Sequence, residues 1–391
     1  MFSLTRRRVT GLMAGVALVA GLGAAQAQED DIVIGGSIPL TGVFAFAGVA
    51  IEAGMQDYIK QVNEAGGIGG RNLRLAYEDT GYKVDQSVAV FNKLTSQDEI
   101  HLYYGDSTGF AKTIAPELNR MGGMIMGGAS FASELNDPEE HPYMFMAGPD
   151  YSEMIAILME YIAEETPGAR IVLVNSDTEF GRDPIESSRA KAAELGLEIV
   201  EEIITPPTAV DVSTEVLKLR RARPDYTIFH GYILAPLPEF MTQAQQLGLE
   251  TKFMGTFWSM DSSIWDGVGE PADGFMGVMP YRYYYDEEAD APTMAKIREM
   301  RPEYQATGYM QGYLSAMLMA ESARRVLDQG QELTGTNLKA AMNTIEDFDT
   351  GGLIGIPISI PGNSVPVGRV YQYSAAEKKM LPVSDWITVQ E

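Results

Sequence analysis

The sequence predicts an α/β protein with mainly parallel sheets, divided into two lobes. Short apolar runs typical of strands alternate with amphipathic runs typical of helices along most of the 391 residues. Such alternation favours parallel sheets that are covered by helices on both faces. The alternation breaks at Gly148, Pro149 and Asp150 and starts again at Tyr151. Because the chain is also longer than one ordinary domain, we expect two lobes.

The first predicted βαβ unit sets the pattern. Ile32–Ile38 is an apolar run of strand type, and residues 39–48 are expected to form a loop because they are rich in glycine and small residues. The helix that follows ends at Gly66 and Gly67, since glycine readily adopts the left-handed conformation that stops a helix. Leu73–Tyr77 then alternates as a strand does. The crossover of this unit should be right-handed.

The remaining elements are expected in the same alternating order. In the first series we expect helices at 84–94 and 110–121, and strands at 100–104, 123–126 and 142–146. In the second series we expect helices at 151–165, from about 184, at 212–221 and at 239–247, and strands at 170–174, 197–204, 225–229 and 252–255. After about residue 280 we expect helices at 309–327 and 338–345, short strands within 351–360, a strand at 367–373 and a docked apolar tail.

The first 27 residues have the pattern of a secretory signal peptide. Arginines at positions 6–8 precede an apolar stretch, and Ala25-Gln26-Ala27 matches the small-x-small cleavage pattern. The apolar stretch is interrupted by glycine, and no later stretch is long and apolar enough to span a membrane. We therefore expect an exported protein without direct membrane insertion after signal removal; the resemblance described below implies that it is periplasmic. The Sec route and the twin-arginine route both remain open for its export.

Composition excludes several classes of function. Removal of residues 1–27, which hold three arginines and no acidic residue, changes the formal charge from −25 to −28. Such an acidic surface repels nucleic acid, so we expect no nucleic-acid partner. The absence of cysteine excludes disulfides, thiolate metal sites and cysteine nucleophiles. The three histidines are scattered and predict no metal site, and we expect no cofactor.

Residues 105–109 fit the G-x-S-x-G pattern between a strand and a helix. This is the context in which serine hydrolases expose their nucleophile, here Ser107. A hydrolase also needs a histidine after its last strands, but about 160 residues without histidine follow His230. Hydroxyl and N–H groups in the same geometry at a helix N-terminus can bind an anion without catalysing a reaction. We favour anion binding and keep a serine hydrolase using Ser107 as the alternative.

A second loop of the same kind follows the next strand, at residues 127–130. Two such loops at neighbouring strand ends predict one carboxylate held between them. Aromatic residues follow strands in both series and predict a cleft lined by rings, with Phe44 and Phe46 as apolar contacts from the first loop. The candidate ligand-binding residues are Phe46, Asp106, Ser107, Thr108, Gly128, Ala129, Ser130, Phe180, Tyr232, Phe257 and Trp258.

Essentially the full mature chain resembles the periplasmic leucine/isoleucine/valine-binding proteins of ABC importers. The resemblance rests on Ile34-Gly-Gly-Ser-Ile-Pro-Leu-Thr-Gly42, on Asn63-Glu-Ala-Gly-Gly-Ile-Gly-Gly70 and on Tyr77-Glu-Asp-Thr80, together with the order of the elements. It implies the class I periplasmic-binding-protein fold, in which two Rossmann-like lobes joined by three crossovers close on a ligand like a hinge. It assigns residues 28–148 and 280–358 to the first lobe, and 149–279 and 359–391 to the second.

The resemblance also implies roles for single residues. The serine that holds the ligand carboxylate in this family falls on Ser107, and the paired small-residue loop falls on Gly128 and Ser130. The ligand-facing aromatic positions fall near Phe46 and on Phe180 and Tyr232. The disulfide of the family is absent here, because Gly81 and Asp106 stand where its cysteines would be.

One departure from the family concerns the amino group of the ligand. Family members that bind amino acids pair the ligand ammonium with a carboxylate in a loop where this sequence has Thr256-Phe257-Trp258. An unpaired buried ammonium is strongly unfavourable. An α-amino acid therefore fits only if another carboxylate takes over this role; the candidates are Asp106, Asp177, Glu179 and Asp261. The rings favour a small hydrophobic or aromatic carboxylate, and a quaternary ammonium in an aromatic cage is the alternative.

We therefore expect a non-enzymatic solute-binding protein of an ABC importer. It should bind a small carboxylate-bearing solute, either amino-acid-like or a hydrophobic or aromatic acid, in the cleft between its lobes and deliver it to a membrane permease. A ligand sensor on the same fold is the alternative within the binding class. The sequence leaves open the ligand identity, the export route and the oligomeric state.

Overall fold

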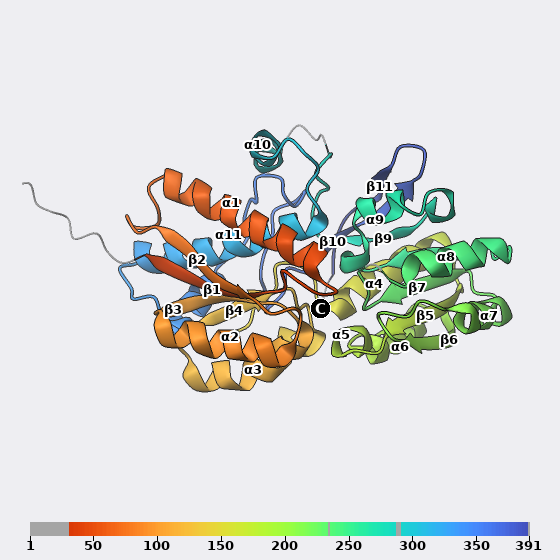
Figure 1. Cartoon of the computed structure of the whole chain (residues 1–391), viewed down its shortest axis with the longest axis horizontal. Helices are drawn as coiled ribbons and strands as arrows, with labels where there is room; N and C mark the ends of the chain where they lie inside the picture. The colour runs from red at the N-terminus through yellow and green to blue at the C-terminus, as the bar shows by residue number, and fades with distance from the viewer. Residues whose placement is uncertain (1–30, 234, 287–290, 390–391) are drawn as a thin grey trace, which may run out of the picture.

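The computed structural model describes residues 31–233, 235–286 and 291–389. The predicted signal peptide lies outside these residues. The described elements form two sheets with their helices, arranged one after the other along the longest axis of the molecule (Figure 1). Among the described residues, no helix is both long and apolar enough to cross a membrane.

The first sheet has four parallel strands in the order β2-β1-β3-β4. These strands are β1 (Ile32–Ile38), β2 (Leu73–Asp79), β3 (Ile100–Gly105) and β4 (Ile125–Gly128). One face is covered by α1 (Ala45–Glu64) and α11 (Thr307–Asp328), and the other by α2 (Val84–Gln97) and α3 (Thr108–Met121). A further helix, α12 (Gly335–Met342), packs against α11 and β4.

The second sheet has seven strands in the order β11-β10-β9-β8-β7-β5-β6. They are β5 (Arg170–Ser176), β6 (Glu198–Thr205), β7 (Tyr226–His230), β8 (Lys252–Gly255), β9 (Met276–Met279), β10 (Val367–Ser374) and β11 (Lys379–Thr388). Strands β5 to β9 are parallel, whereas β10 is antiparallel to both of its neighbours. The helices around this sheet are α4 (Tyr151–Glu165), α5 (Glu179–Arg182), α6 (Ile185–Glu194), α7 (Ser213–Ala222), α8 (Leu237–Gln246) and α9 (Ser262–Asp266).

The prediction of an α/β fold with parallel-rich sheets in two lobes is confirmed. The chain leaves the neighbourhood of the first sheet after β4, returns to it after β9, and leaves it again before β10. These passages agree in number with the three crossovers that the resemblance implies. The residue boundaries of the lobes stay a proposal, and we use the predicted division to name the first and the second lobe.

Several local predictions were wrong. Residues 142–146 form no strand, and Met144 makes only an isolated bridge to Met126. Ile358 likewise makes only an isolated bridge to Phe348. Helix α1 begins at Ala45, inside the expected loop, and α5, α9, α10 (Pro292–Met300), β9 and β11 were not predicted. β11 contains proline, which an edge strand tolerates although it weakens the sequence signal of a strand.

Two glycines allow α1 and α11 to lie in backbone contact. A Cβ atom added to Gly54 would stand 2.1 Å from the carbonyl oxygen of Tyr309, and one added to Gly312 would stand 2.2 Å from that of Ile51. Both distances are far below van der Waals contact, so neither position accepts a side chain without displacing a helix. This contact fixes the position of α1 relative to α11.

We expect Gly312→Ala to lower the free energy of unfolding by about 2 kcal/mol, because the methyl group must push α11 away from α1. Chemical denaturation monitored by circular dichroism measures this change. The matched control is Gly123→Ala, since a Cβ atom at Gly123 meets nothing within 4 Å. Equal stability of the two variants would contradict the close approach of the helices.

Candidate functional site

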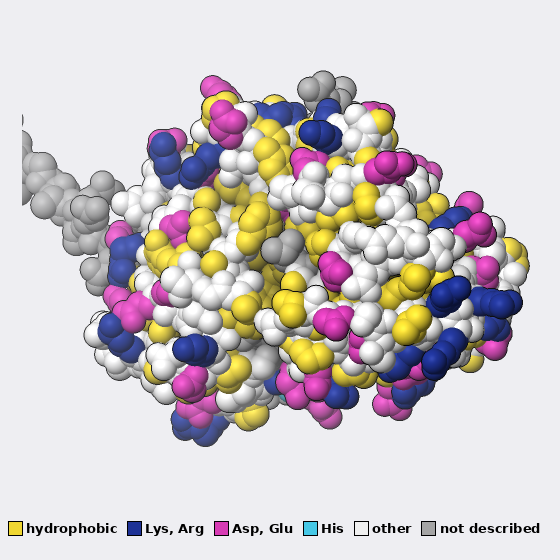
Figure 2. All heavy atoms as spheres, turned by 45° about the vertical axis from the view of Figure 1, so that its right-hand side comes forward, with side chains coloured by type: hydrophobic (Ala, Val, Ile, Leu, Met, Phe, Trp, Pro, Cys, Tyr) yellow, Lys and Arg dark blue, Asp and Glu magenta, His cyan; other side chains and the backbone are white. Residues whose placement is uncertain are grey.

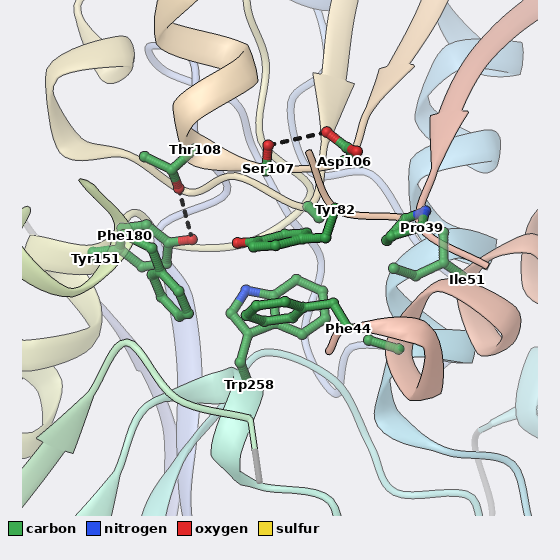
Figure 3. A pocket seen from close by; sticks show the side chains of 12 residues that line it. Pro39, Phe44, Ile51, Tyr82, Asp106, Ser107, Thr108, Tyr151, Phe180 and Trp258 are labelled. Carbon is green, nitrogen blue, oxygen red and sulfur yellow. Dashed lines mark hydrogen bonds between the residues drawn. The ribbon is translucent and has the colours of Figure 1, made fainter. Parts of the chain in front are cut away.

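A small cavity lies between the two lobes at the carboxyl ends of the strands (Figure 3). Its walls come from both lobes and consist of Pro39, Phe44, Ala47, Ile51, Tyr82, Asp106, Ser107, Thr108, Ala129, Tyr151, Phe180 and Trp258. The volume of this cavity is only about 20 Å³, which is room for about one water molecule. The side chains of the two lobes therefore almost fill the space between them, as expected for a closed form.

The N-terminus of α3 forms one wall of this cavity. Ser107 is the N-cap residue, and its Oγ accepts a hydrogen bond of 3.2 Å from the backbone N–H of Phe110. The backbone N–H of Ala111 donates to the carbonyl oxygen of Ser107 at 2.9 Å. Within the described part of the chain, the N–H groups of Thr108 and Gly109 have no hydrogen-bond acceptor. These two groups and the helix dipole offer a site for an anion.

Hydroxyl groups extend this site toward the second lobe. Thr108 Oγ1 lies 3.4 Å from the hydroxyl of Tyr151, the first residue of α4, as the dashed line in Figure 3 marks. Ser130 Oγ donates to Thr108 Oγ1 at 3.1 Å and accepts from the backbone N–H of Ala132 at 3.3 Å. Burial raises the pKa of Tyr151, so this hydroxyl keeps its proton at neutral pH. Ser130 thus supports Thr108 from behind the cavity wall.

Asp106 is the one acidic residue among the cavity-lining residues, which include no lysine, arginine or histidine. It is 1% exposed and accepts hydrogen bonds from three hydroxyl groups. The donors are Thr80, Ser87 at 2.8 Å and Ser107 at 3.0 Å. Burial raises the pKa of Asp106, and the three hydroxyl donors oppose that rise.

Aromatic rings form most of the remaining wall. Phe44 stacks on Tyr82 with ring centroids 3.7 Å apart, and Trp258 lies beside this pair from the second lobe (Figure 3). Tyr151 and Phe180 lie at the other end with centroids 4.9 Å apart. On the face drawn in Figure 2, apolar side chains gather along the line between the lobes, and lysine and arginine lie mainly toward the rim. The cavity is therefore apolar apart from its α3 and Asp106 wall.

The structure brings six of the predicted site residues together and leaves five outside the cavity wall. Asp106, Ser107, Thr108, Ala129, Phe180 and Trp258 line the cavity, whereas Phe46, Gly128, Ser130, Tyr232 and Phe257 do not. Phe46 is 46% exposed. Phe257 is fully buried and packs behind Trp258, and Tyr232 packs on Phe229. The carbonyl oxygen of Gly128 accepts from Gln311 at 2.8 Å.

The early start of α1 explains why Phe44 and Phe46 differ. With 3.6 residues per turn, side chains two positions apart point to opposite sides of a helix, so Phe44 faces the cavity and Phe46 faces outward. Sequence reasoning missed Pro39, Ala47, Ile51, Tyr82 and Tyr151. Tyr82 follows β2 in a strand-end position, which is the signal that could have identified it.

Only one of the four carboxylates considered for a ligand ammonium lines the cavity. Asp177 pairs with Arg182 at 2.7 Å. Glu179 lies 3.6 Å from the ammonium of Lys112, and Asp261 accepts from the backbone N–H of Thr307 at 2.7 Å. Asp106 is therefore the remaining candidate.

The contacts of His230 do not support a serine hydrolase. Its Nε2 lies 2.9 Å from the carbonyl oxygen of Phe180, and its Nδ1 lies 2.8 Å from Thr256 Oγ1. The hydroxyl of Ser107 instead donates to Asp106, so the serine and the histidine do not form a catalytic pair. Within the described ranges, no group of three or more histidine or acidic side chains could hold a metal ion.

Comparison with known proteins finds relatives over most of the chain. The profile of the family described as periplasmic binding protein matches residues 31–379. The leucine-, isoleucine-, valine-, threonine-, and alanine-binding protein of Pseudomonas aeruginosa is 24% identical over 89% of this chain and 91% of its own length. The Leu/Ile/Val-binding protein of Escherichia coli is 26% identical over 70% of this chain and 73% of its own length.

Solved structures share the fold. A branched chain amino acid ABC transporter from Thermus thermophilus with bound valine aligns with a TM-score of 0.82 at 22% identity, over 93% of this chain and 97% of its own. A solute binding protein of an ABC transporter from Rhodopseudomonas palustris, in complex with 3,4-dihydroxy benzoic acid, aligns with a TM-score of 0.77 at 19% identity, over 92% of this chain and 97% of its own.

The burial of His230 makes stability depend on pH. Burial lowers the pKa of His230 to about 3, whereas an unfolded imidazole titrates near 6.5. Between these values only the unfolded chain binds the proton, so the free energy of unfolding falls as the pH drops from 6.5 toward 3. At pH 4 this single group removes roughly 3 kcal/mol.

We expect His230→Gln to lose this part of the pH dependence, because an amide binds no proton. Urea unfolding at pH 7 and pH 4 measures the difference between the variant and the wild-type protein. His101→Gln serves as the control, since the ring of His101 lies near the surface beside Glu99. If all three proteins lose the same stability between the two pH values, His230 is not buried as the neutral form.

Proposed function

The chain belongs to the periplasmic binding protein family, and we propose that it is the solute-binding component of an ABC importer for a small carboxylate-bearing organic solute. The family consists of binding proteins and not of enzymes. The observation that carries the proposal is the cavity between the lobes, to which both lobes contribute rings at the carboxyl ends of strands. Parting of the lobes admits a solute, and closure encloses it.

The α3 wall is the proposed site for the ligand carboxylate. The N–H groups of Thr108 and Gly109 point out of the helix N-terminus, and the hydroxyl of Thr108 lies beside them. Because no lysine or arginine lines the cavity, neutral dipoles and the helix N-terminus must balance the charge of the ligand. Such a site favours a single carboxylate over a multiply charged anion.

The rest of the cavity limits the body of the ligand. Phe44, Tyr82 and Trp258 offer flat apolar surfaces, which suit an aliphatic or aromatic group. Asp106 offers the cavity's one anionic partner for an ammonium group. The proposed ligands are therefore amino-acid-like solutes, which would use Asp106, and hydrophobic or aromatic acids, which would leave it bonded to its three hydroxyl donors.

The proposed cellular role follows from the family. Periplasmic binding proteins act outside the cytoplasmic membrane, and we propose that this chain hands its solute to the membrane permease of an ABC importer. The relatives named above are described as binding branched-chain and other small amino acids, which supports the choice of solute class. We propose export by the Sec or the twin-arginine route on the basis of the N-terminal sequence.

A ligand panel tests the proposed function. We expect at least one carboxylate among branched-chain amino acids, aromatic acids and short-chain acids to raise the thermal midpoint, because a ligand that binds only the folded protein stabilises it by mass action. At a concentration of 100 Kd the gain is about 2.7 kcal/mol. Amides and quaternary ammonium compounds without a carboxylate are the controls. A shift with these compounds and with no carboxylate would overturn the proposed anion site.

Asp106→Asn tests the role of the buried carboxylate. We expect the variant to weaken binding of L-leucine at least tenfold more than binding of 4-methylpentanoate, which lacks the amino group, because a charge-assisted hydrogen bond contributes about 1.5–3 kcal/mol. Isothermal titration calorimetry measures both affinities. Asp177→Asn, at an exposed carboxylate beside Arg182, is the control. An equal effect of Asp106→Asn on the two ligands would mean that Asp106 supports the loops without recognising an ammonium.

A further inference from the structure

Two buried carboxylates of the second lobe, Asp183 and Asp261, accept hydrogen bonds from backbone N–H groups of the first lobe without lining the cavity. Asp183 directly follows α5, and Asp261 directly precedes α9. Figure 1 shows α5 on the lower side and α9 on the upper side of the second lobe, so the two contacts lie in different places along the boundary between the lobes.

Asp183 makes the first of these contacts. Its Oδ1 accepts from the backbone N–H of Ser133 at 3.0 Å and from the hydroxyl of Ser133 at 2.7 Å. Its Oδ2 lies 3.6 Å from the ammonium of Lys112 on α3, which also lies 2.9 Å from Glu134 and 3.6 Å from Glu179. The side chain of Asp183 is 3% exposed. A carboxylate this deeply buried requires such partners, and opening of the lobes would exchange them for water.

Asp261 makes the second contact. Its Oδ2 accepts from the backbone N–H of Thr307, the first residue of α11, at 2.7 Å and from the hydroxyl of Tyr304 at 3.2 Å. Its Oδ1 accepts from the backbone N–H and the hydroxyl of Ser263 within the second lobe, at 3.0 and 2.6 Å. The two oxygens of one carboxylate, 1% exposed, thus hold the starts of helices from different lobes.

Both contacts involve residues that are close, in sequence or by packing, to residues that line the cavity. Lys112 follows the cavity residue Thr108 by one turn of α3. Thr307 precedes Gly308, where an added Cβ atom would stand 3.1 Å from the carbonyl oxygen of the cavity residue Ala47. A change in either contact can therefore alter closure around the cavity while every cavity side chain stays the same.

We propose that Asp183 and Asp261 are positioning residues that hold the lobes closed and so determine how long a ligand stays bound. The proposal rests on the proposed function, in which the ligand lies between the lobes. An enclosed ligand leaves only when the lobes part, so contacts made only in the closed form slow its release. Loss of either contact shifts the protein toward the open form, with or without a ligand, and so speeds ligand release.

The test uses Asp183→Ala, Asp261→Asn and the double variant. Alanine removes the acceptor of the Ser133 backbone N–H and one of the three carboxylates beside Lys112, while the Ser133 hydroxyl keeps Asp150 and Ser152 as partners. Asparagine preserves a helix cap at position 261, but it has one oxygen for two backbone N–H donors, so one of these donors loses its acceptor. Asp177→Ala is the matched control, since Asp177 pairs only with Arg182 of its own lobe.

The first readout needs no ligand. Because the chain has no cysteine, cysteines introduced at the exposed positions Gln97 and Gln246, one in each lobe, carry a unique pair of spin labels. We expect the double variant to show a larger share of long distances than the wild-type protein, with the control unchanged. Identical distance distributions for the wild-type protein and the double variant would overturn the proposal. The thermal midpoint of each ligand-free variant shows whether it is folded.

The second readout is ligand kinetics with L-leucine as the probe. We expect each single variant to raise the dissociation rate about tenfold and the double variant about a hundredfold, since distant contacts without shared partners act additively in free energy. The association rate should not fall, because a solute enters the open form. Unchanged dissociation in the variants would overturn the proposal. If L-leucine binds none of the proteins, that result concerns the proposed function, and the spin-label distances still decide the role of the two carboxylates.

Discussion

The buried carboxylate of Asp106 ties together the loops on which the first lobe's side of the cavity depends. A charge at this depth must be hydrogen-bonded, and its partners come from three segments: Thr80 after β2, Ser87 on α2 and Ser107 before α3. Ser107, one of the two serines that donate to Asp106, also caps α3. The position of the free N–H groups at the start of that helix is therefore fixed by the need to satisfy a buried anion.

The nearly filled cavity makes lobe movement a condition for binding. Rings of both lobes occupy the space in which a solute would lie, and only about 20 Å³ remains open to a water-sized sphere. A solute larger than one water molecule must therefore enter while the lobes are apart. Recognition by the α3 wall and closure through the contacts of Asp183 and Asp261 involve different side chains, so the two steps can vary independently.

The alternation of strands and helices gave the fold class correctly, because each βα unit carries its own periodicity and turn residues. Ser107 and Thr108 were predictable for the same reason, since their strand-end motif is local. The ring positions were harder. Phe44 and Phe46 were both expected in the cavity wall, but α1 starts at Ala45 and only Phe44 lies there. Tyr151, the first residue of α4, was not expected there. β11 was missed because Pro382 weakens the sequence signal of a strand.

The absence of lysine and arginine from the cavity wall has a consequence for ionic strength. Fixed dipoles inside a closed cavity are hardly screened by dissolved ions, whereas a partly exposed charge is screened over about 8 Å at physiological salt. Lys112, with 18% of its side chain exposed, is such a charge, and it belongs to the contact between lobes. With the proposed roles of the cavity and of Asp183, salt therefore acts on the residence time of the solute and leaves the chemical selectivity of the cavity almost untouched.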